Sequence, residues 1–147
     1  MAENPKTNYP VSSRVITASS MPGQPDLARQ MKDVFSNYVY CFSGVWQKIE
    51  SVKHPDMAGY ENLAYGAVED PDSVMESTAR PRVAVFESKG KGPYGRDLRV
   101  VVDYDIDDFL LGGTRGRLTT AYDRDVRRFP DPRVGKVIYT KNGGRVR

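Results

Sequence analysis

The chain has 147 residues, of which 39% are hydrophobic and 28% are charged, and its formal net charge at pH 7 is +3. This length suits one domain with a modest core and is too short for two independent domains. No apolar run approaches the length that spans a bilayer, and the N-terminus lacks the features of a secretory signal. With the single cysteine Cys41, we expect a soluble, cytoplasmic protein with no internal disulfide and no membrane partner.

The basic residues are concentrated in the last third of the chain. Residues 114–147 contain ten basic and three acidic residues, whereas the rest contains twelve basic and sixteen acidic ones. Clustered Arg and Lys favour a polyanionic partner, because phosphate groups bind them. The alternative interpretation is a solvated tail.

In the first half, apolar residues at helical spacing predict helices, with one strand between them. We expect helices over residues 27–37, 45–52 and 59–68, and a strand over residues 38–42. Pro55 ends the second helix, because a proline disfavours the α conformation of the residue before it. His54 is therefore expected at the end of that helix.

The second half predicts an antiparallel meander of four strands. These strands are expected over residues 74–77, 82–88, 98–104 and 117–122, and the glycine-rich segment KGKGPYGRD reads as a hairpin loop between the middle two. The fold class predicted is α+β, with N-terminal helices packed on a four-stranded antiparallel sheet. A last short strand is expected over residues 134–139.

Three regions follow from these patterns. Residues 1–25 contain four prolines and are predicted to form a mobile N-terminal arm. Residues 26–123 form the α+β domain, and residues 124–147 form a basic C-terminal extension that could add a strand to the sheet. Both ends could hold an assembly partner.

Metal and nucleotide chemistry find little support in the sequence. One histidine and one cysteine cannot supply the usual ligand set of a zinc site, so we expect no metal site and no cofactor. The aspartates at 103, 105, 107 and 108 lack the pattern of a calcium loop and are read as a solvated loop, with a weak divalent-ion site as the alternative. No phosphate-binding glycine loop is present.

The remaining inventory, one histidine with many arginines and lysines, suits RNA cleavage. When the RNA's own 2′-hydroxyl is the nucleophile, the protein needs a base, an acid and cations facing the phosphate. His54 can serve as base or acid near neutral pH, and arginines match the phosphate oxygens with their planar fork. The alternative is that His54 only caps the preceding helix.

Several motifs, in this order, resemble the phage-type branch of the barnase, EndoU, colicin and RelE-like (BECR) nuclease superfamily, whose members are often toxins. They begin with a tryptophan-containing helix at Trp46 and end with a TAY strand at Tyr122. Between these lie HPDM (54–57), GYENL (59–63), AVEDPDSV (67–74), RVAVFES (82–88) and GPYGRDLRVVVDY (92–104). The resemblance covers about half of the chain. It implies a curved antiparallel sheet whose concave face binds RNA.

The resemblance also implies roles for single residues. His54 corresponds to the histidine of the HPE-type turn, and Lys48 lies near the place where relatives have a second histidine. The remaining catalytic candidates stabilise or position the phosphate: Arg82, Arg96, Thr120 and Tyr122. The RNA-binding candidates are Lys89, Lys91, Arg115, Arg117, Arg127 and Arg128.

The functional hypothesis is therefore a metal-independent, toxin-like endoribonuclease that cleaves RNA through attack of the 2′-hydroxyl on the phosphate. An acidic antitoxin or immunity protein is a second expected partner, because it would complement the basic extension. The alternative is a nuclease-like fold without catalysis that acts as an RNA-binding or phage-structural assembly module. Lys48 in place of the second histidine motivates this alternative.

Overall fold

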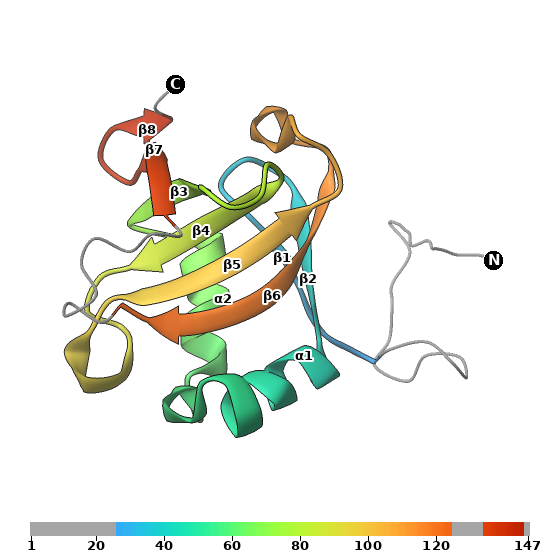
Figure 1. Cartoon of the computed structure of the whole chain (residues 1–147). Coiled ribbons are helices and arrows are strands. Elements are labelled where there is room, and N and C mark those ends of the chain that lie inside the picture. Colours follow the sequence, from blue (N-terminus) through green and yellow to red (C-terminus); the bar gives the residue numbers. More distant parts are fainter. Residues whose placement is uncertain (1–25, 125–133, 146–147) are drawn as a thin grey trace.

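The protein is described here by a computed structural model that covers residues 26–124 and 134–145 (Figure 1). A single mixed sheet dominates the fold. Its strands are β1 (Leu27–Lys32), β2 (Tyr38–Phe42), β3 (Ser73–Ser77), β4 (Val83–Ser88), β5 (Leu98–Tyr104), β6 (Arg115–Asp123), β7 (Val134–Thr140) and β8 (Gly144–Arg145). The helices are α1 (Ser43–Lys48) and α2 (Glu61–Glu69), with a π-turn η1 (Ile49–Lys53) and the 3-10 turns η2 (Pro55–Met57), η3 (Pro93–Gly95) and η4 (Phe109–Leu111).

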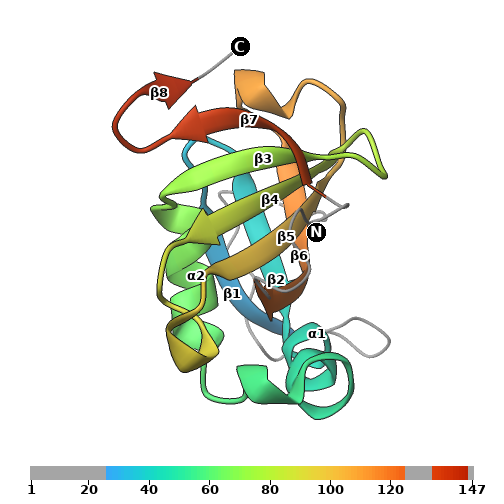
Figure 2. The same cartoon turned by 60° about the vertical axis from the view of Figure 1, so that its left-hand side comes forward.

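The strands lie in the order β1-β2-β6-β5-β4-β3-β7-β8. All neighbours are antiparallel except β2 and β6, which pair in parallel with Tyr38 opposite Arg115. Helix α2 packs behind the sheet, where it contacts β1, β4 and β5, and the strands curve around it (Figure 2). The opposite face of the central strands is in front in Figure 1, with α1 below it.

The expected fold class, N-terminal helices packed on a four-stranded antiparallel sheet, is wrong. The sheet is larger and mixed, and the two α-helices are short. The four-stranded meander does exist as β3 to β6, and β2 and β7 lie where strands were expected. What the prediction missed is the hairpin β1–β2, which pairs through β2 with β6 and extends the sheet.

The segment expected as the first helix folds as strand β1 because its pattern is ambiguous. Leu27 and Met31, the buried residues of this strand, are four positions apart. That spacing places two side chains on one face of a helix and equally on one face of a regular strand, and in β1 a register shift between Leu27 and Arg29 interrupts the alternation. Pairing with β2 decides the outcome, with Met31 opposite Val39.

The turn of this hairpin is fixed by a buried carboxylate. Asp33 is 5% exposed and accepts hydrogen bonds from the backbone amides of Phe35 and Asn37, each at 2.9 Å, and from the hydroxyl of Tyr104 on β5. Burial, followed by the nearby charge of Asp33, raises the pKa of Tyr104. The Asn37 side chain donates to the carbonyl oxygen of Phe109 at 2.8 Å. These bonds join the β1–β2 turn to the far end of β5 and to η4.

The core lies between α2 and the covered face of the sheet. It contains side chains from almost every element, including Trp46 of α1, Ile49 of η1, Val68 of α2 and Phe86 of β4. Trp46 and Ile49 are 2% and 0% exposed. They anchor α1 and η1 against the sheet and so fix the position of His54, which follows η1.

Cys41 of β2 provides a pH-dependent test of this core. Burial raises the pKa of its thiol to about 11; a hydrogen bond with Tyr65 opposes the shift and the charge of Glu61 adds to it. The folded protein therefore keeps the thiol protonated while the unfolded chain loses the proton near its ordinary value of 9.0. Stability from this group is full below pH 9 and is lost as pH rises towards 11. In urea titrations at pH 8 and 10.5, the unfolding free energy of wild type should fall more than that of Cys41→Ala; equal falls would contradict the buried thiol.

Two regional predictions have different outcomes. The arm predicted over residues 1–25 lies outside the described residues. In the predicted extension over residues 124–147, strand β7 pairs antiparallel with β3, and β8 pairs with β7. Within the described part of the chain, no helix is long and apolar enough to cross a membrane.

Candidate functional site

A row of polar side chains crosses the face of the sheet opposite α2. The strand registers place Ser73 opposite Glu87, Glu87 opposite Arg99, and Arg99 opposite Tyr122. Residues directly opposite each other in neighbouring strands point to the same side of a sheet. We call these four residues, contributed by β3, β4, β5 and β6, the polar row.

The polar row is held together by a buried ion pair. Arg99 Nε donates to Glu87 Oε2 at 3.0 Å, and both side chains are about 5% exposed. Ser73 Oγ donates to Glu87 Oε1 at 3.2 Å. Burial opposes the charge on Arg99, but the hydrogen bond and the charge of Glu87, with a smaller contribution from Tyr122, raise the pKa of the guanidinium. The two side chains of the pair are therefore held in a fixed orientation.

His54 lies at the Tyr122 end of the row. The imidazole and the Tyr122 ring have centroids 5.9 Å apart and are tilted by 35°. Tyr122 is buried, whereas His54 is partly exposed. The placement of His54 at the end of a helix was expected and is confirmed, since it directly follows η1 and precedes η2.

The turn before His54 has an unusual hydrogen-bond pattern. The backbone amide of His54 donates to the carbonyl oxygen of Ile49 at 2.7 Å, which is the i to i−5 pattern of a π-helix. Such turns are rare, and those that occur are frequently found at functional sites. Pro55 ends this turn and is the first residue of η2.

Strand β6 has a bulge beside this turn. Val101 of β5 pairs with Thr120, but Val102 pairs with Leu118, so Thr119 is the extra residue. The Thr119 hydroxyl donates to the carbonyl oxygen of Val101 at 3.3 Å, and Lys53 Nζ donates to the carbonyl oxygen of Thr119 at 3.3 Å. The bulge thus ties the end of η1, through Lys53, to β6.

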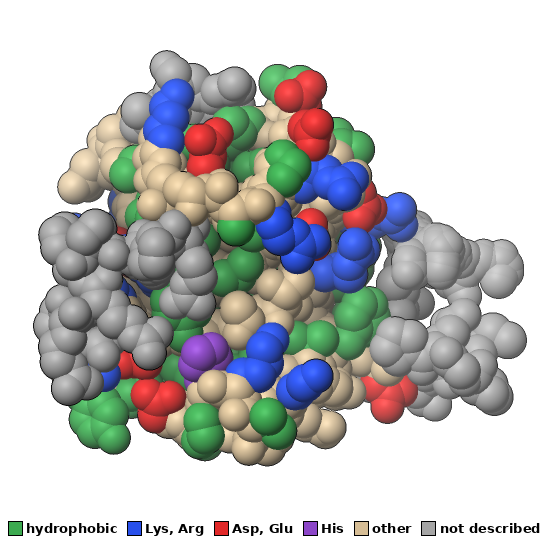
Figure 3. Space-filling view, in the orientation of Figure 1, with side chains coloured by type: hydrophobic (Ala, Val, Ile, Leu, Met, Phe, Trp, Pro, Cys, Tyr) green, Lys and Arg blue, Asp and Glu red, His purple; other side chains and the backbone are tan. Residues whose placement is uncertain are grey.

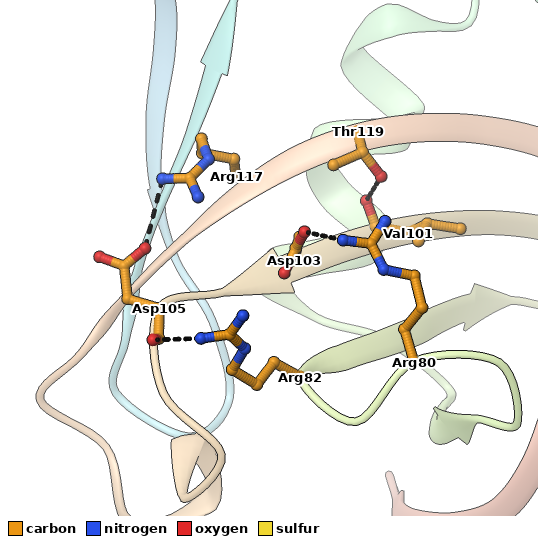
Figure 4. Close-up of polar contacts among 7 residues, drawn as sticks. All are labelled: Arg80, Arg82, Val101, Asp103, Asp105, Arg117 and Thr119. Carbon is orange, nitrogen blue, oxygen red and sulfur yellow. Dashed lines mark hydrogen bonds and ion pairs between the residues drawn. The ribbon is translucent and has the colours of Figure 1, made fainter.

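Four arginines form a second group, which we call the arginine cluster: Arg80 and Arg82 before β4, and Arg115 and Arg117 on β6. Figure 4 shows Arg80, Arg82 and Arg117 of this cluster. Arg80 pairs with Asp103 at 3.1 Å, and Arg115 and Arg117 both pair with Asp105, at 3.4 and 3.2 Å. The side chains of these three arginines are 50–66% exposed. The cluster therefore offers cationic groups to solvent in spite of its carboxylate partners.

Between the polar row and the arginine cluster this face is mostly apolar, with Met75 and Val85 buried and Val101 and Thr120 partly exposed. Met75, Val85, Val101 and Thr120 lie opposite one another in the next register row. The Thr120 hydroxyl is buried and has no hydrogen-bond partner among the described residues. Figure 3 shows this face, with Lys and Arg side chains gathered on its right-hand part and others beside the histidine in its lower half. Cationic groups therefore lie on both sides of an apolar part of this face.

The structure brings together only part of the predicted site. His54, Tyr122 and Thr120 lie on or beside the polar row, and Arg82, Arg115 and Arg117 belong to the arginine cluster. Lys48 is exposed in the last turn of α1, while Lys53 is the lysine that contacts β6. Three predicted residues lie in the β4–β5 loop. Lys89 and Lys91 are exposed, and Arg96 pairs with Asp123 at 2.8 Å. Arg127 and Arg128 lie outside the described residues.

Sequence reasoning missed Glu87, Arg99, Ser73 and Lys53. A signal for the first two was present, because each is a charged residue inside an otherwise apolar strand. The β4–β5 hairpin pairs Ser88 with Leu98 and therefore Glu87 with Arg99. A hairpin register drawn from the glycine-rich loop would have paired these charges.

The comparisons with known proteins give no family. No protein-family model matches the chain, and no curated protein and no solved structure is significantly similar to it. Among the described residues, no group of three or more His, Cys, Asp and Glu side chains is placed to hold a metal ion. The resemblance to BECR nucleases therefore stays a prediction.

Proposed function

We propose that this chain is a metal-independent, toxin-like endoribonuclease related to the BECR nucleases, and that RNA binds on the face opposite α2. One observation carries the proposal: the buried pair Glu87–Arg99 is aligned with Tyr122, and His54 lies at the end of that line. A carboxylate, an imidazole and a guanidinium are the three groups that this cleavage needs.

The reaction assigns one proton transfer to each of two residues. The Glu87 carboxylate takes the proton from the 2′-hydroxyl, whose oxygen then forms a bond to phosphorus. The bond from phosphorus to the 5′-oxygen breaks, and protonated His54 gives its proton to that oxygen. The products are a 2′,3′-cyclic phosphate and a 5′-hydroxyl end, and a proton returned from Glu87 to His54 through water restores the enzyme.

Arg99 and Lys53 supply positive charge to this reaction. Negative charge on the phosphate oxygens grows as the 2′-oxygen attacks, and fixed cations in a poorly hydrated site stabilise it more strongly than cations in water. Arg99 is held by Glu87, and Lys53 is held by the bulge at Thr119. Little reorganisation is then required during the reaction.

The arginine cluster supports binding of a longer RNA. Asp103, which pairs with Arg80, is four residues from Arg99 along β5, a distance of about 13 Å for an extended strand. That separation is of the order of two nucleotides of a single strand, so the cluster would meet the RNA backbone beyond the cleaved phosphate. Exposed arginine–aspartate pairs contribute little to stability and can exchange one anion for another at low cost.

The test is cleavage of total RNA by the purified protein in EDTA. Wild type should produce fragments that end in a 2′,3′-cyclic phosphate, and His54→Ala should be slower by at least about a hundredfold. The matched control is Gln47→Ala, because Gln47 is exposed and lies in α1, before η1 and His54. This variant should cleave RNA like wild type.

Three outcomes would overturn the proposal. Intact RNA with wild-type protein would favour the alternative, a non-catalytic RNA-binding or assembly module. Cleavage that EDTA abolishes would contradict the metal-independent reaction. Equal rates for wild type and His54→Ala would remove His54 from the mechanism.

A further inference from the structure

Tyr94 in the loop between β4 and β5 has a backbone conformation that is unfavourable for its residue type. The amide of Arg96 donates to the carbonyl oxygen of Pro93 at 3.1 Å, and the residues between them, Tyr94 and Gly95, have φ values of 60° and 71°. Two central residues with positive φ define a type I′ turn, which prefers Asn-Gly. A bulky residue at positive φ is strained.

Packing does not explain the tyrosine. Its side chain is 82% exposed, which is the largest value among the exposed large hydrophobic residues that the structure describes. Burial of the ring therefore returns little of the strain energy. Strained residues that give no packing benefit are found mainly at functional sites.

The loop around Tyr94 is held firmly. The amide of Gly92 donates to the carbonyl oxygen of Arg96 at 2.8 Å, and the amide of Gly90 donates to Asp97 Oδ1 at 3.0 Å. The guanidinium of Arg96 lies 5.4 Å from the centroid of the Tyr94 ring and pairs with Asp123. The ring is thus supported from one side by an anchored cation.

The loop lies at the polar-row end of the sheet. It begins two residues after Glu87 and ends two residues before Arg99. Its anchor Asp123 pairs with Leu98 and therefore points to the α2 side of the sheet. Figures 1 and 2 both show η3 at the same end of the sheet as η2, the turn that follows His54. The ring therefore lies at the end of the sheet where His54 lies.

We propose that Tyr94 is a stacking platform for an unpaired base of the RNA, at the end of the sheet where His54 lies. This inference rests on the proposed function and names its substrate class, which is single-stranded RNA. Aromatic rings bind single strands because every base has a π face to stack on. Arg96 beneath the ring and the exposed Lys89 and Lys91 add positive charge for the adjoining phosphates. A paired base has both faces covered and cannot stack in this way.

The experiment measures binding of a fluorescein-labelled single-stranded RNA nonamer by anisotropy, with His54→Ala in all proteins so that cleavage does not interfere. Tyr94→Asn removes the ring and places the preferred residue in the turn, so this variant should be at least as stable as its parent. It should bind the nonamer about tenfold more weakly, which is the effect of one stacked base. Tyr94→Phe, the matched control, should bind like the parent.

A second set of nonamers, each with one abasic ribose at a different position, identifies the stacked base. At one position, removal of the base should weaken binding to the parent about tenfold and have little further effect on Tyr94→Asn. Equal affinities of Tyr94→Asn and its parent for the intact nonamer would overturn the platform. The platform would also be overturned if Tyr94→Asn lost the same affinity, relative to its parent, for the nonamers of every abasic position.

This experiment does not depend on catalysis. Wild-type protein that fails to cut RNA, together with base-dependent binding through Tyr94, would end the proposed function and leave the platform. Cleavage of RNA by wild-type protein, without base-dependent binding through Tyr94, would support the proposed function and overturn the platform.

Discussion

Glu87→Gln is expected to lower the rate of RNA cleavage by about two to four orders of magnitude. The amide has the shape of the carboxylate and can still accept a hydrogen bond from Arg99, but it cannot take the proton of the 2′-hydroxyl. The measurement is the initial rate on a single-stranded RNA in EDTA, at a temperature where circular dichroism shows the variant to be folded. An unchanged rate would exclude Glu87 as the base.

The matched control is Glu76→Gln. Glu76 is exposed on β3, so this change removes the same charge from a neighbouring strand without altering the polar row. Its rate should equal that of wild type. A similar loss in both variants would mean that net charge, and not the position of Glu87, controls the reaction.

Arg99→Met is expected to destabilise the fold by about 3–5 kcal/mol, because it leaves the Glu87 carboxylate buried without its partner. Both members of the pair are about 5% exposed, so water compensates only a small part of the lost ion pair. Urea denaturation at pH 7 measures the loss. A change below about 1 kcal/mol would show that the carboxylate is hydrated in the folded protein.

A double variant separates stability from chemistry. Glu87→Leu with Arg99→Met replaces the pair by apolar side chains of similar volume, a change that is often neutral or stabilising. We expect this variant to unfold near the wild-type midpoint and to have no RNA cleavage. Full activity in a stable double variant would mean that the pair serves only the fold.

Most of the sheet could be predicted from the sequence, because local patterns specify its central part. The runs at β4 and β5 are apolar and β-branched, and the glycine-rich loop between them indicates a hairpin. The first strand could not be assigned in this way. Leu27 and Met31 fit a strand and a helix equally well, and only the pairing with β2, and of β2 with β6, distinguishes them.

The candidate site was predicted at its edges and missed at its centre. His54 was identified as the only histidine, and the proline after it fixed its place at the end of a turn. Glu87 and Arg99 were read as parts of strands, because their importance depends on cross-strand register. Lys53 needed two further facts, the π-turn η1 and the bulge at Thr119, and neither of these can be predicted from residue types alone.

The parallel pairing of β2 with β6 has a consequence for how the protein forms. It joins residues 38–40 to residues 115–117, and the hydrogen bond between the Thr114 amide and Asn37 spans 77 positions. Closing so long a loop costs entropy before any contact repays it, which slows folding. During synthesis, the N-terminal hairpin has no neighbour on its β6 side until β6 leaves the ribosome. Because β6 also carries Tyr122, a nascent chain that lacks it has neither a closed sheet nor a complete polar row, and activity would begin only after β6 has been synthesised.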